Sequence, residues 1–378
     1  MKPEGSLTLP VDRRYSFRRH PRLALPAIAL LGCVALGTVA EIAARTLRPD
    51  WAPTREERVK LWVYDALLGW AHAPNQRARF NHPDFSVEVL INSQGMRDTE
   101  YSVRRTTKRR MLVLGDSFAW GFGVEHHERF SELLEGSHPD WEIINSSVSG
   151  YGTDQEFLLL RERGLFLQPD AVLLLFCEND FGNNLHAEGY WHFKPHFAIE
   201  NGHLQLHNVP VPKSTTNQHL ARFFLGSTYL GPQLSYSYNL AKRGLLGPPR
   251  ADSNSGKGGE RDDVTYRLIA EMNLLCKRGG SLFVLVSVPM TTMKPSNLQA
   301  LADREGFPYL PLDAAFASST ISVSFPHDRH WNARGHRIAA KAIDAFLWKA
   351  GVFGASKLER QREEASPGLA RTALSGSR

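Results

Sequence analysis

The chain has 378 residues, of which 42% are hydrophobic and 22% charged, a balance typical of a globular protein with room for one large α/β domain or two smaller ones. Its formal net charge of +6 raises the question of a nucleic-acid partner. The chain has no zinc-finger spacing and no basic stripe interleaved with stacking aromatics, so we expect none. Three cysteines are too few for a disulfide framework, and we expect all three to be small buried hydrophobes.

A membrane span is the first element expected along the chain. Residues 1–22 are basic, and residues 23–40 (LALPAIALLGCVALGTVA) carry no charge. As a helix, this uncharged run would extend over about 27 Å, the thickness of a thin hydrocarbon core. We expect residues 23–41 to form a retained signal anchor. Cleavage near the small residues of GTVAEIA and lipid attachment at Cys33 are the alternatives.

Basic residues flank the expected span on both sides, which leaves only a small margin for the positive-inside rule. We expect the N-terminus to lie in the cytoplasm and the rest of the chain outside it. The chain would then cross a bacterial-type inner membrane once, with its main domain on the periplasmic or extracytoplasmic side.

An alternation of strands and helices follows residues 42–108, which we expect to be an irregular lead-in with one short alternating strand in VEVLINS. The expected strands are RMLVLG, WEIINSS, DAVLLLFC, SLFVLVSVP and FPYLPLD, and the expected helices are HERFSELLEG, GTDQEFLLLRERG, DDVTYRLIAEMNLLCKRG and SNLQALADREG. Two runs, VLLLF and LFVLV, are apolar without alternation, which is typical of strands covered on both faces. This order predicts an α/β fold with a doubly wound parallel sheet over residues 109–350.

Residues 185–260 interrupt this alternation and are expected to be an insertion. The insertion contains a possible hairpin around IENGHLQL and a flexible linker at Gly247–Asp263. Its histidines lack the tight spacing of a zinc site, so we expect no metal. Residues 351–378 are polar and are expected to form a disordered tail.

Polar residues or a glycine follow three of the expected strands, and polar residues precede the last helix. They are Asp116 and Ser117 after the first strand, Gly150 after the second, Asn179 and Asp180 after the third, and Asp328 and His330 before the final helix. In an open parallel sheet, ligands gather at the carboxyl ends of the strands. We therefore expect these residues to meet at one edge of the sheet.

Ser117 is the candidate nucleophile, because a serine hydroxyl needs an adjacent base and His330 can supply one. Asp328 could orient His330 through one ring nitrogen. The backbone N–H groups of Ser117 and Gly150 and the side-chain amide of Asn179 could form the oxyanion hole. Taken alone, Ser117 could cap a helix, Asn179 could stabilise a turn and His330 could be a surface histidine. Their occurrence together favours a catalytic site.

Two further polar residues are expected to have structural roles. Asp180 is expected to brace its own loop, and His336 is expected to be a packing residue on the last helix. The glycines of GDSFAWGFG come too late for a dinucleotide-binding loop, so we expect no nucleotide cofactor.

The four blocks resemble those of the GDSL/SGNH hydrolase superfamily, which are a Gly-Asp-Ser, a glycine, a Gly-x-Asn-Asp and a closing Asp/His pair. They match here at residues 115–117, Gly150, residues 177–180 and residues 328–330, within residues 109–347. The resemblance implies the SGNH fold, a flavodoxin-like three-layer α/β/α architecture around a parallel sheet. It also implies serine esterase chemistry that uses no cofactor.

This chain departs from the family pattern in two places. Cys177 stands where the family usually has glycine, and the last block is Asp-x-His rather than Asp-x-x-His. The shorter spacing, followed by Trp331, is similar to the D-x-H-W signature of extracytoplasmic polysaccharide O-acetyltransferases.

The leading hypothesis is a membrane-anchored serine esterase that removes acyl groups from a carbohydrate or lipid through an acyl-enzyme on Ser117. The first alternative is an O-acyltransferase that moves the acyl group to an extracytoplasmic polysaccharide. The second is a non-catalytic glycan-binding protein of the same fold. The sequence assigns no oligomeric state.

Overall fold

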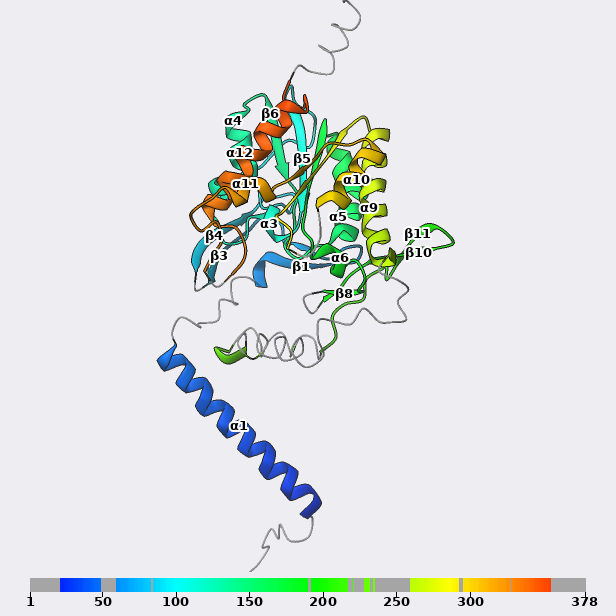
Figure 1. Ribbon diagram of the computed structural model, residues 1–378. Helices are drawn as coiled ribbons and strands as arrows, with labels where there is room; N and C mark the ends of the chain where they lie inside the picture. Colours follow the sequence, from blue (N-terminus) through cyan, green and yellow to red (C-terminus); the bar gives the residue numbers. More distant parts are fainter. Residues whose placement is uncertain are drawn as a thin grey trace, which may run out of the picture.

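Five parallel strands form the central sheet of the computed structural model (Figure 1). They are β5 (Arg109–Gly115), β6 (Trp141–Asn145), β7 (Ala171–Phe176), β12 (Leu282–Ser287) and β13 (Tyr309–Pro311). Their order across the sheet is β13-β12-β7-β5-β6, and each neighbouring pair is parallel. Every residue of β7 is buried, as its unbroken apolar run predicts. The five expected strands are confirmed.

The structure describes residues 21–48, 59–82, 84–189, 192–216, 220, 228–231, 234, 259–291, 295–326 and 328–354. Most of the basic N-terminal segment, most of the linker expected at Gly247–Asp263 and most of the tail expected at residues 351–378 lie outside the described residues.

Helices cover both faces of the sheet, which makes the fold three-layered (Figure 1). The longer ones are α4 (Phe130–Ser137), α5 (Thr153–Glu162), α9 (Gly259–Arg278), α10 (Pro295–Glu305) and α12 (Ala333–Lys349). Alternate residues of β5 enter different cores. Leu112 and Leu114 pack with side chains of α5, α9 and α10, whereas Met111 and Val113 pack with those of α4 and α12. The α/β class with a central parallel sheet is thus confirmed.

Shorter helices connect these layers. They are α3 (Ser117–Trp120), η4 (His126–Glu128), η5 (Gly164–Leu167), α6 (Asp180–Asn183) and α11 (Asp313–Ala317). Two of them, α3 and α6, begin just beyond the carboxyl ends of β5 and β7, at the edge of the sheet where the sequence places its polar blocks.

The lead-in is more regular than the sequence suggests: the one strand expected there, in VEVLINS, is confirmed within residues 85–91, but three further strands accompany it. After η3 (Val59–Leu61) come two antiparallel hairpins, β1 (Trp62–Asp65) with β2 (Gly69–His72), and β3 (Gln76–His82) with β4 (Phe85–Ile91). Two of the four residues of β1 are exposed, so this strand leaves little pattern in the sequence. A small core that includes Phe80, Val89 and Trp120 packs the lead-in against α3.

The described part of the insertion also consists of hairpins. These are β8 (Glu188–Gly189) with β9 (His192–Phe193), and β10 (His196–Glu200) with β11 (His203–His207). Asn201 and Gly202 both have positive φ, as the tight turn of such a hairpin requires. The hairpin expected around IENGHLQL is confirmed.

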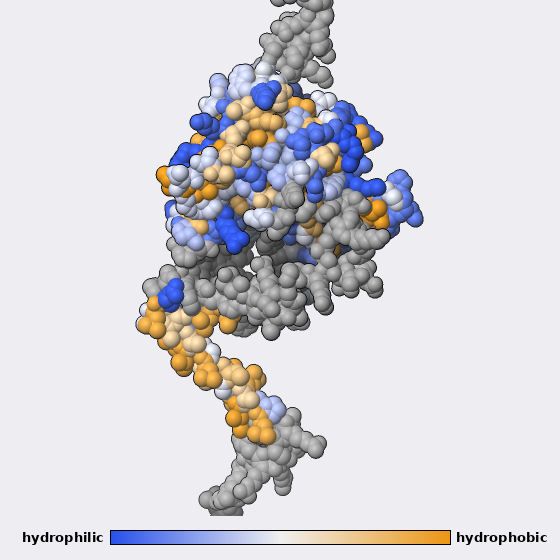
Figure 2. Space-filling view, in the orientation of Figure 1, coloured by the Kyte–Doolittle hydropathy of each residue, from blue (hydrophilic) through white to orange (hydrophobic). Residues whose placement is uncertain are grey.

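An apolar helix, α1 (Pro21–Leu47), precedes the lead-in. Its segment Leu25–Leu47 is long and apolar enough to cross a membrane, by length and composition, and forms the orange arm in Figure 2. The helix continues beyond the expected limit at residue 41. Cys33 was expected to be buried, but it is exposed because α1 stands apart from the cores of the sheet.

Candidate active site

The chain turns sharply between the end of β5 and the start of α3. Gly115 has a φ of +153°, and a Cβ there would lie 2.9 Å from the carbonyl oxygen of Leu175, so only glycine fits. Asp116 caps the N-terminus of α3, where its Oδ1 accepts a hydrogen bond from the Phe118 N–H at 2.9 Å. Because Asp116 is the cap, the Ser117 hydroxyl is left for another partner.

Ser117, His330 and Asp328 form a continuous chain of hydrogen bonds, although 213 positions separate Ser117 from His330. The Oγ of Ser117 lies 2.6 Å from Nε2 of His330. Nδ1 of the same ring bonds to Oδ1 of Asp328, which also accepts the backbone N–H of His330 at 2.8 Å. With Nδ1 as a donor, Nε2 is the acceptor for the Ser117 hydroxyl. The structure therefore brings these three residues together.

The environment of Asp328 favours the ionised carboxylate. Burial opposes ionisation, but the hydrogen bonds and charge of His330 outweigh it and hold the pKa of Asp328 below its ordinary value. The side chains of Asp328 and His330 are 20% and 23% exposed, so the pair is accessible from solvent.

Two aromatic rings, one in α3 and one just after it, pack against the imidazole of His330. The ring of Phe122 stacks on His330 with centroids 4.3 Å apart, and Phe118 lies 4.8 Å away at a tilt. These contacts restrict rotation of the imidazole, so that Nε2 stays directed at Ser117.

Gly150 lies in a loop that follows β6, the strand beside β5. The loop runs along β5, since the Ser146 N–H donates to the Val113 carbonyl at 2.9 Å and the Val148 N–H donates to the Gly115 carbonyl at 3.1 Å. Gly150 itself has a φ of +86°, which favours glycine.

Asn179 lies directly after β7, on the other side of β5. Its Nδ2 donates to Oδ2 of Asp116 at 3.4 Å, so it lies beside the turn that carries Ser117. Within the described part of the chain, the N–H groups of Ser117 and Gly150 donate no hydrogen bond. These N–H groups and the Asn179 amide are the donors that the sequence analysis expects in an oxyanion hole.

No protein-family model and no curated protein matches the chain. Some solved structures are similar to the chain at low identity. A GDSL-like lipase from Bacteroides thetaiotaomicron is 14% identical, with a TM-score of 0.33, over 66% of this chain and 93% of that one. An acetyl xylan esterase is 14% identical, with a TM-score of 0.36, over 64% and 98%. A member of the lipolytic protein G-D-S-L family from Veillonella parvula is 10% identical, with a TM-score of 0.36, over 64% and 97%. The chain resembles the GDSL/SGNH hydrolases. The fold and the chemistry of the site are argued from the residues of this chain.

Cys177 and Trp331, the residues that mark the two departures from the GDSL/SGNH pattern, are both buried. Cys177 packs with hydrophobic residues on the α4 and α12 side of the sheet, and burial raises the pKa of its thiol well above the ordinary range. Trp331 is 3% exposed and packs on Phe316 and His336. His336 is buried as well, which confirms its expected packing role.

Asp180 has the bracing role expected from the sequence. Its Oδ2 accepts a hydrogen bond from the Thr153 hydroxyl at 2.9 Å, which ties the Asn179 loop to the start of α5. Burial, and next the charge of Asp116, raise the pKa of Asp180 well above its ordinary value. Asp180 is thus poorly suited to replace Asp328 as the carboxylate partner of His330.

The sequence analysis missed what the lead-in contributes to this site. The buried guanidinium of Arg97 donates to three carbonyl oxygens at and just beyond the end of α3. His82, at the tip of the β3–β4 hairpin, helps to lower the pKa of Asp328. Neither residue lies in a recognisable motif, and both act through tertiary contacts that sequence spacing does not reveal.

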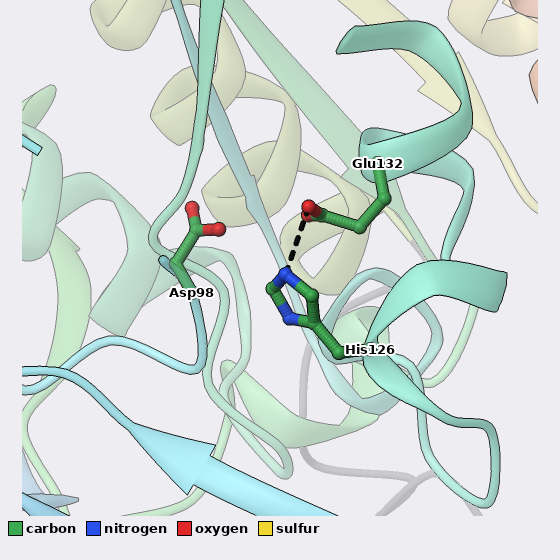
Figure 3. A group of neighbouring side chains, drawn as sticks. All are labelled: Asp98, His126 and Glu132. Carbon is green, nitrogen blue, oxygen red and sulfur yellow. Dashed lines mark ion pairs between the residues drawn. The ribbon is translucent and has the colours of Figure 1, made fainter. Parts of the chain in front are cut away.

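Asp98, His126 and Glu132 form the group of described residues with metal-ligand geometry (Figure 3). Nε2 of His126 lies 2.9 Å from Oε2 of Glu132. Arg129 already occupies this group, with Nη2 2.6 Å from Glu132, 3.0 Å from His126 and 3.4 Å from Asp98. Because a guanidinium supplies the positive charge, we assign the group a structural role.

Proposed function

We propose that this chain is a serine esterase of the SGNH type, with Ser117 as the residue that becomes acylated. The observation that carries the proposal is the 2.6 Å contact between Ser117 Oγ and His330 Nε2, with Nδ1 of the same ring held by Asp328. A hydroxyl, a base and an orienting carboxylate in this order are the groups that activate a serine.

In the first half of the reaction, the Ser117 oxygen attacks the carbonyl carbon of the ester, and its proton passes to Nε2 of His330. The bond between that carbon and the leaving alcohol oxygen then breaks, and the alcohol takes the proton from His330. Asp328 stays ionised throughout and stabilises the imidazolium that forms between these steps.

The carbonyl oxygen carries the negative charge of the tetrahedral intermediate. We assign its stabilisation to the N–H groups of Ser117 and Gly150 and to the side-chain amide of Asn179, which follow the adjacent strands β5, β6 and β7. Removing one such donor from an enzyme typically lowers kcat by about 10²- to 10³-fold.

In the second half, His330 takes a proton from water, which attacks the acyl carbon, releases the acid and restores the Ser117 hydroxyl. A sugar hydroxyl in the place of water would make the chain an O-acyltransferase, which the Asp328-x-His330-Trp331 block favours through its similarity to polysaccharide O-acetyltransferases. Analysis of the products formed from an acyl donor and a glycan separates the two. An acylated glycan indicates transfer, and free acid alone indicates hydrolysis.

We further propose that the reaction takes place at the outer surface of the inner membrane, on an acylated carbohydrate or lipid. The length and composition of α1 support an anchor. In the view of Figure 1, the end of the sheet marked by α3 and α6 lies on the side of the domain nearer α1. Ser117 and Asn179 lie at this end, where a substrate at the membrane surface would be within reach.

Labelling with a fluorophosphonate probe, followed by mapping of the modified peptide, tests the proposed function. We expect the label on Ser117 and its loss in Ser117→Ala. We also expect this variant to hydrolyse p-nitrophenyl acetate at least ~10³-fold more slowly than wild type. Ser137→Ala, which changes an exposed serine at the end of α4, is the control and should keep both properties. A label on another residue would contradict the role of Ser117, and a folded wild type that takes no label would favour the glycan-binding alternative.

A further inference from the structure

Lys194 lies between β9 and β10 in the insertion, yet its side chain is buried within the hydrolase-like domain. The residue is 1% exposed, although lysine is almost never fully buried without a partner. Its Nζ forms an ion pair with the carboxylate of Asp154. It also donates to the carbonyl oxygens of Asn183 at 3.2 Å and His186 at 3.4 Å. These partners replace the hydration that a buried ammonium loses.

The partners of Lys194 come from two segments that each carry a proposed oxyanion-hole residue. Asp154 is in the first turn of α5, which begins shortly after Gly150. Asn183 is the last residue of α6, which begins directly after Asn179. Lys194 belongs to neither segment, so its side chain bridges the two from outside.

Two further hydrogen bonds join the same segments. The Thr153 hydroxyl donates to Asp180 at 2.9 Å, and the Asp154 N–H donates to Oδ1 of Asn184 at 3.1 Å. The ion pair of Lys194 and these two hydrogen bonds therefore hold the same two segments together.

Lys194 also supplies positive charge to a buried acidic region. Asp154, Glu156 and Asp180 are each at most 1% exposed. Burial raises the pKa of all three carboxyls, and the charge of Lys194 opposes this shift for Asp154 and Asp180. Without the ammonium, the carboxyl groups of the two segments would lose the counter-charge that holds them together.

We propose that Lys194 is a positioning residue that sets the separation between the Gly150 N–H and the Asn179 side-chain amide. This inference rests on the proposed function, and it gives the insertion a part in the reaction. A misplacement of about 1 Å in a catalytic group can cost on the order of 10²-fold in rate. Because oxyanion donors act mainly on the transition state, their displacement should lower kcat and leave KM nearly unchanged.

Hydrogen exchange of the full-length protein tests the bridge without reference to activity. In Lys194→Gln, we expect faster exchange than in wild type at the amides of residues 152–156 and also at those of residues 180–184. Lys213→Gln is the matched control, because Lys213 is an exposed lysine of the same insertion. Faster exchange in one segment alone, or in neither, would overturn the bridge.

Kinetics with p-nitrophenyl acetate test the expected effect on kcat. Rates are expressed per active site, counted by titration with the fluorophosphonate. We expect Lys194→Gln to lower kcat at least tenfold with KM within twofold of wild type, and Lys213→Gln to change neither. The double variant Lys194→Met with Asp154→Asn removes both charges of the ion pair together, so it guards against misfolding and should show the same low kcat.

A kcat within twofold of wild type in Lys194→Gln or in the double variant would overturn the positioning role. A wild-type protein that neither turns over nor takes the label would instead refute the proposed function. The exchange measurement would then still decide whether Lys194 bridges the two segments.

Discussion

At the scale of single residues, burial keeps the imidazole of His72, in the lead-in, neutral. Its ring packs against those of Trp62 and Trp120, and its Nδ1 lies 3.1 Å from the Gly95 carbonyl oxygen. Burial, together with the charges of two nearby arginines, lowers the pKa of His72 to about 4. The folded protein therefore holds this imidazole neutral at neutral pH, with Nδ1–H donating to Gly95.

This burial predicts a loss of stability on acidification. As the pH falls through about 6.5, the unfolded chain takes up a proton at His72, whereas the folded chain does so only near its pKa of about 4. His72→Phe keeps a ring packed against the two tryptophans, but this ring does not titrate. We expect the free energy of unfolding of wild type, relative to that of this variant, to fall by about 3 kcal/mol between pH 7 and pH 4. Urea unfolding of the detergent-solubilised chain measures it.

The exposed His203 provides the control for this measurement. Between pH 7 and pH 4, the free energy of unfolding of His203→Phe should change by the same amount as that of wild type. If the free energy of unfolding of His72→Phe also changed by the same amount as that of wild type, His72 would be protonated or accessible in the folded state, contrary to its burial.

At the scale of elements, the short helix α3 depends on a residue outside the sheet domain. Arg97 donates to the carbonyl oxygens of Trp120 at 3.1 Å, Gly121 at 2.5 Å and Val124 at 2.6 Å. A helix of one turn leaves its last carbonyl groups without partners in the helix, and here a guanidinium supplies them. Arg97 thereby fixes the end of the element whose first residue is Ser117.

We expect Arg97→Met to lower the free energy of unfolding by about 2–4 kcal/mol, because three buried carbonyl oxygens lose their charged donor. The same change should slow fluorophosphonate labelling of Ser117, since α3 is no longer held at its end. Arg77→Met is the matched control, because Arg77 lies in the same lead-in with its side chain 71% exposed. Labelling of folded Arg97→Met at the wild-type rate would show that α3 positions Ser117 without help.

The elements of the sheet could be predicted because each of their signals is local. A run such as VLLLF identifies a strand covered on both faces without reference to any other part of the chain, and a polar residue directly after it points to the edge where ligands gather. Ser117 and Asn179 were selected in this way, and His330 was selected from its place just before the last helix. The lead-in and the insertion could not be understood in the same way. Arg97 and Lys194 look like ordinary solvated cations in polar segments, and their roles come from distant carbonyl and carboxylate groups that only the fold brings near.

At the scale of the whole molecule, the insertion contacts both the candidate anchor and the hydrolase-like domain. The carboxylate of Glu41 in α1 accepts the N–H of Tyr229 at 2.8 Å and that of Leu230 at 3.1 Å. Lys194, in the same insertion, lies buried against the segments that follow β6 and β7. The insertion thus links the end of α1 to the edge of the sheet that carries the candidate site.

With α1 as the proposed anchor, its orientation would decide which compartment this edge faces. Before its apolar segment the chain has Lys2, Arg13, Arg14, Arg18, Arg19 and Arg22, and in or after the last turn of the helix it has Arg45, Arg48, Arg55, Arg58 and Lys60. Because the bias toward a cytoplasmic N-terminus is slight, a few charges should be enough to disturb it.

We expect protease added to intact spheroplasts to digest the domain formed by residues 59–354, and to leave a fragment protected by the membrane that contains α1. A variant in which glutamine replaces Arg13, Arg14, Arg18 and Arg19 keeps the apolar segment but leaves most of the positive charge on its C-terminal side. We expect it to insert in both orientations, so that part of the domain resists the protease until the cells are lysed. Immunoblotting of the fragments measures both results. A wild-type domain that stays protected until lysis would place Ser117 in the cytoplasm, where an extracytoplasmic substrate could not reach it.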